Sequence, residues 1–141
     1  MGKQFSLTSA DKFQLGAYRA DPSEPANGGI VVIQEIFGVN HHIRAVCDRF
    51  AQEGYVALAP ALFDRQEKNF ESGYTPDEIA NARKFVANPD WGAMLKDAQA
   101  AIDDLKKVGP VAIVGFCMGG TVAFLAACRL TGLSFLAICP P

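Results

Sequence analysis

Four short, unbroken runs of apolar residues constrain the fold of this chain more than any other feature. Each run has the length of one strand, and none alternates apolar with polar side chains as a strand with one face in water does. Unbroken apolar runs are typical of strands that are buried on both faces, as in parallel sheets. The runs are Ile30–Ile33, Tyr55–Ala59, Val111–Val114 and Phe135–Ile138.

Helical segments are predicted between these runs, and two further strands, Phe5–Thr8 and Phe13–Arg19, precede them. Strands that alternate with helices predict an α/β fold whose mostly parallel sheet is covered by helices on both faces. The expected helices run from about 41 to 52 after the cap Asn40, from the capping box Thr75-Pro76-Asp77-Glu78 to about Ala87, from Asn88 or Asp90 to about Lys107, and from near Gly119 to before Gly132.

The composition indicates a single domain over residues 1–141. The chain is 50% hydrophobic and 20% charged with a net charge of −2, which is too apolar and too weakly charged for intrinsic disorder. No basic patch indicates binding to nucleic acid, and no apolar run approaches the roughly 18–20 residues of a membrane helix. The N-terminus opens no signal peptide, because no apolar stretch follows its single charge at Lys3.

The four cysteines Cys47, Cys117, Cys128 and Cys139 have spacings of 70, 11 and 11 residues, which match no metal-ligand pattern. Without a secretory signal we expect no disulfide framework, and we interpret them as reduced thiols of a cytoplasmic protein. Neither a metal nor a cofactor is implied. The default for such a thiol is a small buried side chain, and Cys128 and Cys139 keep that interpretation.

Cys117 departs from this default because of the residues around it. The stretch Val111–Gly120 reads as a strand, a sharp turn and the start of a helix, and Gly115-Phe116-Cys117-Met118-Gly119 matches the nucleophile elbow G-x-S-x-G with cysteine in place of serine. The glycines lack a β-carbon, so the turn can close. The thiol then lies at a helix N-terminus, which favours a thiolate and a developing oxyanion. The alternative is one more buried thiol beside a glycine turn.

A second group of candidate residues follows the run Ile30–Ile33, in the stretch Gln34–Ile43. Because parallel strands end at one edge of their sheet, we expect this loop at the same edge as Cys117. An elbow needs a second oxyanion donor from such a loop. The backbone N–H of Ile36 is placed to serve beside that of Met118.

Glu35 stands in this loop at the end of its strand, where a carboxylate would be partly buried. A carboxylate near a thiol can accept its proton, so Glu35 is a candidate to activate Cys117. The alternative is that Glu35 caps a turn or pairs with an arginine such as Arg44 or Arg65.

Together these segments resemble the dienelactone hydrolase family, carboxymethylenebutenolidase-like cysteine hydrolases of the α/β-hydrolase fold. The resemblance covers nearly the whole chain from about Phe13. It rests on the order and spacing of Gln34-Glu35-Ile36-Phe37-Gly38 with His42-Ile43-Arg44, of Gly54–Pro60, and of Gly115–Gly120. It implies hydrolysis of a small-molecule ester or lactone without a cofactor.

The resemblance also implies a role for each matching residue. Cys117 is the nucleophile, Glu35 interacts with its thiol, and the N–H groups of Ile36 and Met118 form the oxyanion hole. Members that cleave dienelactone bind a substrate carboxylate with arginine. Arg83 is the only arginine in the corresponding helix, but it falls about one turn from the expected place, which leaves the substrate open.

The triad of that family is incomplete in this sequence. The resemblance implies an aspartate and a histidine downstream of the nucleophile, whereas only 24 residues follow Cys117 and none is an aspartate or a histidine. We therefore expect the N-terminal portion of an α/β-hydrolase domain, truncated after the strand that follows the elbow helix. A missing C-terminal segment or a second chain would complete the sheet. The rival hypotheses are a non-catalytic module that pairs with another chain and a redox-sensitive protein that acts through Cys117.

The remaining polar candidates have simpler interpretations. His41 and His42, the only histidines, are expected to be exposed or to cap a helix, and Trp91 is expected to pack at a helix start. Asp64 and Arg65 either line the cleft or form a surface salt bridge. Three aspartates of the long helix are expected on its solvated face: Asp97, Asp103 and Asp104.

Overall fold

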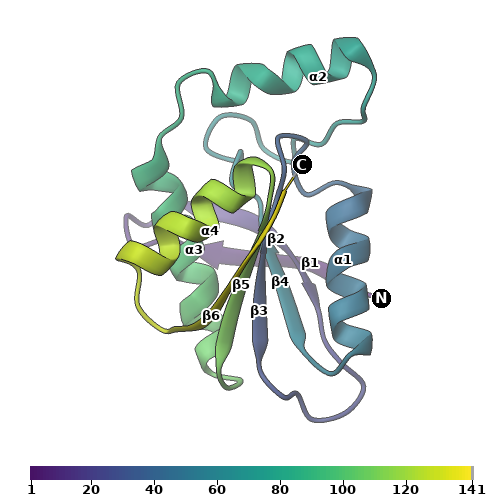
Figure 1. Cartoon of the computed structure of the whole chain (residues 1–141), viewed down its shortest axis with the longest axis vertical. Coiled ribbons are helices and arrows are strands. Elements are labelled where there is room, and N and C mark those ends of the chain that lie inside the picture. The colour runs from purple at the N-terminus through teal and green to yellow at the C-terminus, as the bar shows by residue number, and fades with distance from the viewer. Residues whose placement is uncertain (141) are drawn as a thin grey trace.

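Six strands form one sheet in the order β1-β2-β4-β3-β5-β6 (Figure 1). This computed structural model describes residues 1–140, so Pro141, the last residue of the expected domain, lies outside the described residues. The strands are β1 (Lys3–Thr8), β2 (Gln14–Ala20), β3 (Gly29–Ile33), β4 (Val56–Pro60), β5 (Val111–Phe116) and β6 (Leu133–Cys139). The helices are α1 (His41–Gln52), α2 (Pro76–Arg83), the 3₁₀ helix η1 (Lys84–Val86), α3 (Trp91–Lys106) and α4 (Met118–Arg129).

The prediction of a mostly parallel sheet is confirmed. β4, β3, β5 and β6 run parallel, with Gly29 of β3 opposite both Val56 of β4 and Val111 of β5. β1 and β2 add an antiparallel pair at the other edge. Every residue of β3 and β4 is buried, as their unbroken apolar runs predict.

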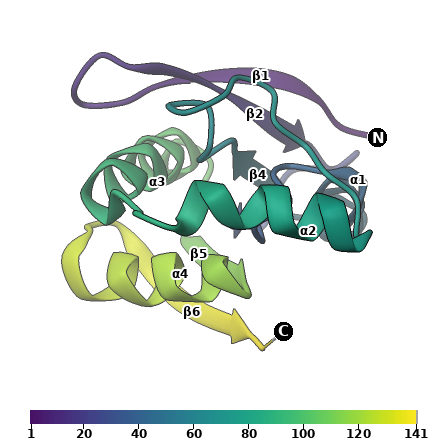
Figure 2. The same cartoon turned by 90° about the horizontal axis from the view of Figure 1, so that it is seen from above.

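Helices cover both faces of the sheet, as expected (Figure 2). On one face α3 and α4 pack Ile102 and Val122 against Val31 of β3 in the larger core. On the other face α1 packs Ile43 and Cys47 against the sheet. The helical spacing of Ile43, Val46, Cys47 and Phe50 predicts that these four residues form the inner face of α1. Ile43 and Cys47 are buried as predicted, whereas Val46 and Phe50 are only partly buried.

The run Phe135–Ile138 forms β6, but the prediction that it is buried on both faces is wrong. Phe135 and Ile138 leave 67% and 50% of their surface exposed. The cause is the place of β6 at the end of the sheet. It pairs with β5 on one side, and within residues 1–140 no strand follows on the other.

Capping residues predicted the helix starts well. Asn40 accepts a hydrogen bond from the N–H of Ile43 at 3.3 Å, and the capping box of Thr75 and Glu78 is present. Asp90, rather than Asn88, caps α3. The predicted end of the second helix at Ala87 is too late. The N–H of Lys84 bonds three residues back, to Asn81, and this bond starts the tighter 3₁₀ helix.

The prediction that Asp97 lies on the solvated face of α3 is wrong. Its side chain is fully buried and accepts hydrogen bonds from Arg65 at 2.8 and 3.0 Å. Asp97 stands three residues after Met94 and four before Ala101, so it lies on the buried stripe of α3. Of the other two aspartates, Asp103 is exposed as expected.

Asp104 and Asp64 also differ from expectation. Asp104 is half-buried and pairs with Arg19 at 2.9 Å. Asp64 is buried and accepts the N–H of Gly16 at 2.7 Å and that of Asn69 at 3.0 Å. Because these backbone groups bind its carboxylate, Asp64 forms no surface salt bridge, and it lines a shallow hollow beside Gly16 and Asn69.

The cysteines divide into buried and accessible thiols. Cys47 is fully buried in α1, and burial raises the pKa of its thiol to about 12. The prediction of a buried thiol is wrong for Cys128, which is exposed, and only partly right for Cys139, which is half-buried. Cys128 lies on the outer side of α4, since that helix turns Val122, Ala123 and Ala126 toward the sheet.

Candidate active site

Cys117 occupies a sharp turn between β5 and α4. Its backbone φ is +54°, a left-handed value that a non-glycine residue adopts only at a cost in energy. It is the N-cap residue of α4, and its side chain is exposed. The structure therefore contains the strand, turn and helix start of the nucleophile-elbow pattern.

Two glycines allow this turn to close. A Cβ atom on Gly115 would overlap the carbonyl group of Gly119, and a Cβ atom on Gly119 would overlap the carbonyl oxygens of Ile33 and Gln34. The second overlap shows that the start of α4 lies against the end of β3. The elbow and the loop after β3 thus meet at one edge of the sheet, as the parallel strands predict.

The loop after β3 carries the other expected site residues. Glu35 and Ile36 are half-buried in the turn that directly follows β3. Met118 is the first residue of α4, where a backbone N–H has no acceptor within the helix. The fold therefore brings the segments of Glu35, Ile36, Met118 and Cys117 to the same edge.

The alternative that Glu35 pairs with an arginine is wrong, because both candidate arginines bind other carboxylates. Arg44 pairs with Glu71 at 2.8 Å. Arg65 forms hydrogen bonds with Asp97 and Asp11. Within residues 1–140, Glu35 forms no salt bridge.

The side chain of Gln34 fixes the position of this loop. It is fully buried, its Nε2 donates to the carbonyl oxygen of Glu35 at 3.0 Å, and its Oε1 accepts the N–H of Leu62 at 3.0 Å. Leu62 belongs to the segment after β4, so one amide joins the loops of two neighbouring strands. No role was predicted for Gln34. The available signal was a polar residue directly after an unbroken apolar run.

A second segment is bound to the far end of the loop and positions α2. The N–H of Ser72 donates to the carbonyl of Phe37 at 3.1 Å, and the ring centroids of Phe37 and Tyr74 are 4.7 Å apart. These contacts hold α2 above the edge at which β3 and β5 end (Figure 1). Arg83, the expected carboxylate-binding residue, is exposed at the C-terminal end of α2.

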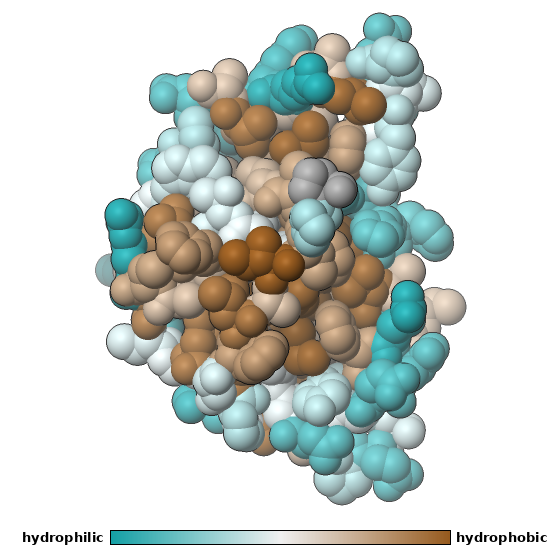
Figure 3. All heavy atoms as spheres, in the orientation of Figure 1, coloured by the Kyte–Doolittle hydropathy of each residue, from teal (hydrophilic) through white to brown (hydrophobic). Residues whose placement is uncertain are grey.

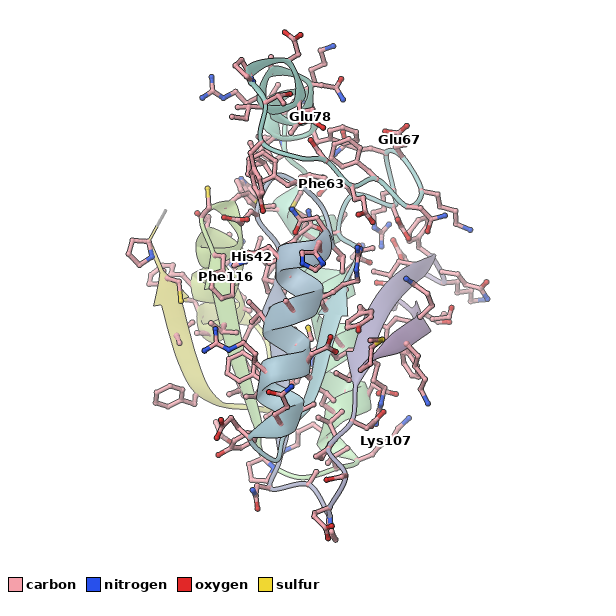
Figure 4. All side chains as sticks on the ribbon, turned by 90° about the vertical axis from the view of Figure 1, so that its right-hand side faces the viewer. His42, Phe63, Glu67, Glu78, Lys107 and Phe116 are labelled. Atoms are coloured by element: carbon pink, nitrogen blue, oxygen red, sulfur yellow. The ribbon has the colours of Figure 1, made fainter. Side chains whose placement is uncertain are left out.

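His42 packs against Phe116, the residue that precedes Cys117. The rings of His42 in α1 and Phe116 in β5 meet edge to face, with centroids 6.0 Å apart (Figure 4). Both histidines are exposed, as predicted. With Val46 and Arg49, these two rings line a hollow of about 350 Å³ beside α1.

β6 forms a hydrogen bond with the backbone of Cys117. The N–H of Cys117 donates to the carbonyl oxygen of Cys139 at 3.3 Å. The fold thus places next to each other two cysteines that are 22 positions apart in the sequence.

Within residues 1–140, no cluster of three or more His, Cys, Asp and Glu side chains is arranged to hold a metal ion. No helix of that stretch is long and apolar enough to cross a membrane.

Comparison with known proteins identifies the family. A family model described as "Dienelactone hydrolase family" matches residues 15–137. The chain belongs to the dienelactone hydrolase family. A Synechocystis sp. protein named "Putative carboxymethylenebutenolidase" is 45% identical over 120 residues, which are 81% of this chain and 49% of that protein. "Carboxymethylenebutenolidase 1" of Cupriavidus pinatubonensis is 32% identical over 128 residues, 87% of this chain and 55% of that one.

A solved structure of the dienelactone hydrolase family has the same fold. The crystal structure of a "Putative Dienelactone Hydrolase" from Klebsiella pneumoniae superposes with a TM-score of 0.76 at 32% identity. The match covers 96% of this chain and 58% of that chain. The predicted α/β-hydrolase fold is thereby confirmed. The chain spans about half the length of the curated relatives it matches.

Proposed function

We propose that this chain carries the nucleophile part of an active site that hydrolyses a small ester or lactone. The observation that carries the proposal is the elbow at Cys117, whose exposed thiol lies at the N-terminus of α4 and beside the loop after β3. Relatives named carboxymethylenebutenolidase support this class of substrate. Because the chain spans about half of those relatives, the activity is proposed for a complete protein of which residues 1–141 form the N-terminal portion of one domain.

The mechanism that fits this geometry is acyl transfer. Glu35 accepts the thiol proton, and the thiolate of Cys117 attacks the carbonyl carbon. The carbonyl oxygen becomes an oxyanion that accepts hydrogen bonds from the N–H groups of Ile36 and Met118. When the tetrahedral intermediate collapses, the C–O bond to the leaving alkoxide breaks, the alkoxide takes the proton that Glu35 accepted, and a thioester remains on Cys117. A histidine outside this chain then takes a proton from water, whose oxygen attacks the thioester; the C–S bond breaks, the acid is released, and the histidine returns the proton to the Cys117 thiolate.

The test is acylation of Cys117 by an activated ester. The chain is treated with p-nitrophenyl acetate, and intact-mass and peptide analysis locate the acetyl group. We expect one acetyl group, on Cys117, to accumulate, because the deacylating histidine is absent. Cys117→Ala should abolish the modification, whereas Cys128→Ala, which removes the other exposed thiol of α4, should leave it unchanged. Acetylation that follows Cys128, or that survives in Cys117→Ala, contradicts the proposal.

Glu35 is tested by the pH dependence of Cys117 alkylation. If Glu35 accepts the thiol proton, Glu35→Gln changes the alkylation curve of Cys117. An unchanged curve would show that Glu35 does not act on the thiol.

Arg83 is proposed as the binding site for a substrate carboxylate. In a complete protein, Arg83→Gln should then raise KM for anionic esters while leaving KM for neutral esters unchanged.

We further propose that additional polypeptide, either a C-terminal segment or a second chain, covers the open side of β6. The support is the exposure of Phe135 and Ile138 at the sheet edge, together with a hollow of about 510 Å³ between β5, β6 and the end of α1. Figure 3 shows a broad hydrophobic area over α4 and β6 on this side of the molecule. A non-catalytic module that pairs with another chain would use the same surface, and acylation of Cys117 distinguishes it from the hydrolase. A cytoplasmic location remains a prediction from the sequence.

A redox function for Cys117 is the second candidate. It is favoured by Cys139, whose carbonyl binds the N–H of Cys117. Hydrogen peroxide would oxidise the Cys117 thiolate to a sulfenic acid, and the Cys139 thiol would displace water to form a disulfide. Sulfenic-acid labelling without acetylation by the ester would support this function. Acetylation with no disulfide would exclude it.

A further inference from the structure

We infer that Gln34 is a positioning residue of the oxyanion hole, an inference that rests on the proposed function. The Gln34 side chain binds the carbonyl oxygen of Glu35, and that carbonyl belongs to the same peptide unit as the N–H of Ile36. Gln34 thereby orients the proposed oxyanion donor without touching the substrate.

The geometry of the peptide bond makes this link direct. A trans peptide is planar, and its C=O and N–H point in opposite directions. Residues 1–140 contain no cis peptide. A hydrogen bond of 3.0 Å from Gln34 Nε2 to Glu35 O therefore turns the N–H of Ile36 away from the buried amide. Within the described residues the N–H of Ile36 donates to no protein acceptor, so it is available to an oxyanion.

The other end of the amide is fixed as well, so the side chain has one orientation. Gln34 Oε1 accepts the N–H of Leu62, which is itself buried in the main core. A flipped amide would set its NH₂ group against the N–H of Leu62, two donors with no acceptor between them, and such a pair is unfavourable in a buried site. The structure thus holds the amide between two backbone groups of separate loops.

Gln34 also connects the two halves of the proposed oxyanion hole. Its backbone carbonyl lies so close to Gly119 that a Cβ atom there would overlap it. Gly119 follows Met118, the second proposed donor, in the first turn of α4. One residue therefore contacts the elbow through its backbone and orients the Ile36 peptide through its side chain.

The experiment compares two reactions of the same thiol in the 141-residue chain. Acetylation by p-nitrophenyl acetate passes through an oxyanion, whereas alkylation by iodoacetamide displaces iodide and forms none. Gln34→Leu removes both hydrogen bonds at similar volume, and Gln34→Glu keeps an acceptor for Leu62 but loses the donor to Glu35. We expect both variants to lower acetylation of Cys117 relative to alkylation by about tenfold to a hundredfold, since complete removal of an oxyanion donor costs about 10²–10³ in rate.

A matched control separates positioning from loss of stability. Asp90→Ala removes the N-cap of α3, which is a structural hydrogen bond outside the loops of the site. It should leave the ratio of acetylation to alkylation unchanged. A Gln34 variant that lowers both reactions equally, or that keeps the wild-type ratio, overturns the inference. A wild-type chain that is alkylated but never acetylated at Cys117 overturns the proposed function and the inference with it.

Discussion

At the scale of single residues, Gly119 shows how little space the elbow leaves. Gly119→Ala should lower the free energy of unfolding by about 2–4 kcal/mol, because the new Cβ atom overlaps the carbonyl oxygens of Ile33 and Gln34. Gly92 is the matched control, since it holds the same second position in the first turn of α3. A Cβ atom there meets only Asp90 Oδ1 at 3.5 Å, so Gly92→Ala should stabilise the chain by about 0.5–1 kcal/mol. Urea unfolding measures both, and effects of equal sign would contradict the argument.

Cys47 gives a prediction about alkaline stability. Desolvation first, and the negative charge of Asp48 second, raise the pKa of its thiol from 9.0 to about 12. As the pH rises, the unfolded state therefore loses this proton before the folded state does. The contribution of Cys47 to stability is complete below pH 9 and is lost between pH 9 and 12, at about 1.4 kcal/mol per pH unit.

The measurement is the free energy of unfolding as a function of pH above 9. Cys47→Ala should flatten this dependence, although it also removes packing atoms and lowers stability at neutral pH. Cys128→Ala should leave the slope unchanged, because that thiol is exposed. A slope that persists in Cys47→Ala would assign the alkaline loss to another group.

At the scale of elements, an ion pair inside the protein joins α3 to the segment after β4. Arg65→Met leaves the fully buried carboxylate of Asp97 without its partner and should cost about 3–5 kcal/mol. The double variant Arg65→Met with Asp97→Leu removes both charges and should recover most of that loss.

The control is Lys107→Met. Lys107 lies at the end of α3 with 78% of its side chain exposed (Figure 4), so its pair with Asp104 should contribute at most about 1 kcal/mol. Thermal unfolding compares the variants. A double variant as unstable as Arg65→Met would contradict the role of the unpaired charge.

The elements that were predicted correctly are those whose signals are local. Asn40, the Thr75 capping box and Asp90 mark helix starts with hydrogen bonds that reach only three residues along the chain. Asp97 was predicted incorrectly because its partner Arg65 is 32 residues away in sequence. A charged residue on a buried stripe is interpreted correctly only when such a partner is known.

For the geometry of the candidate site, the predictions also succeeded where the signal was local and failed where the contact was between distant residues. The turn at Cys117 follows from the spacing of Gly115 and Gly119, which is a property of five consecutive residues. That this turn meets the loop after β3 follows from parallel strands ending at one edge. The role of Gln34 could not be derived, because its hydrogen bond to Leu62 crosses between loops of different strands. The pattern of apolar residues in a strand does not encode such a contact.

At the scale of the whole molecule, the two edges of the sheet differ in how they are protected. β1 ends one edge with mostly polar exposed residues, among them Lys3 and Gln4. β6 ends the other with exposed Phe135 and Ile138, and unpaired apolar edge strands associate with other chains. The exposure of β6 also explains why an unbroken apolar run gave a wrong prediction of burial. The run predicts burial for a strand that is covered on both faces, whereas within residues 1–140 β6 pairs only with β5 and every one of its residues is half-buried or exposed.

This asymmetry predicts concentration-dependent self-association through β6. Size-exclusion chromatography with light scattering should show species heavier than the 15.1 kDa monomer as the concentration of the chain rises. Phe135→Lys places a charge on the edge strand and should shift the equilibrium to monomer. Phe124→Lys is the matched control, because Phe124 is 53% exposed but lies on α4 rather than on the edge. It should associate as the wild type does. If both variants become monomeric, general surface hydrophobicity drives association instead of the edge. If the wild type stays monomeric at every concentration, β6 needs no cover, and the proposal that further polypeptide completes the sheet fails.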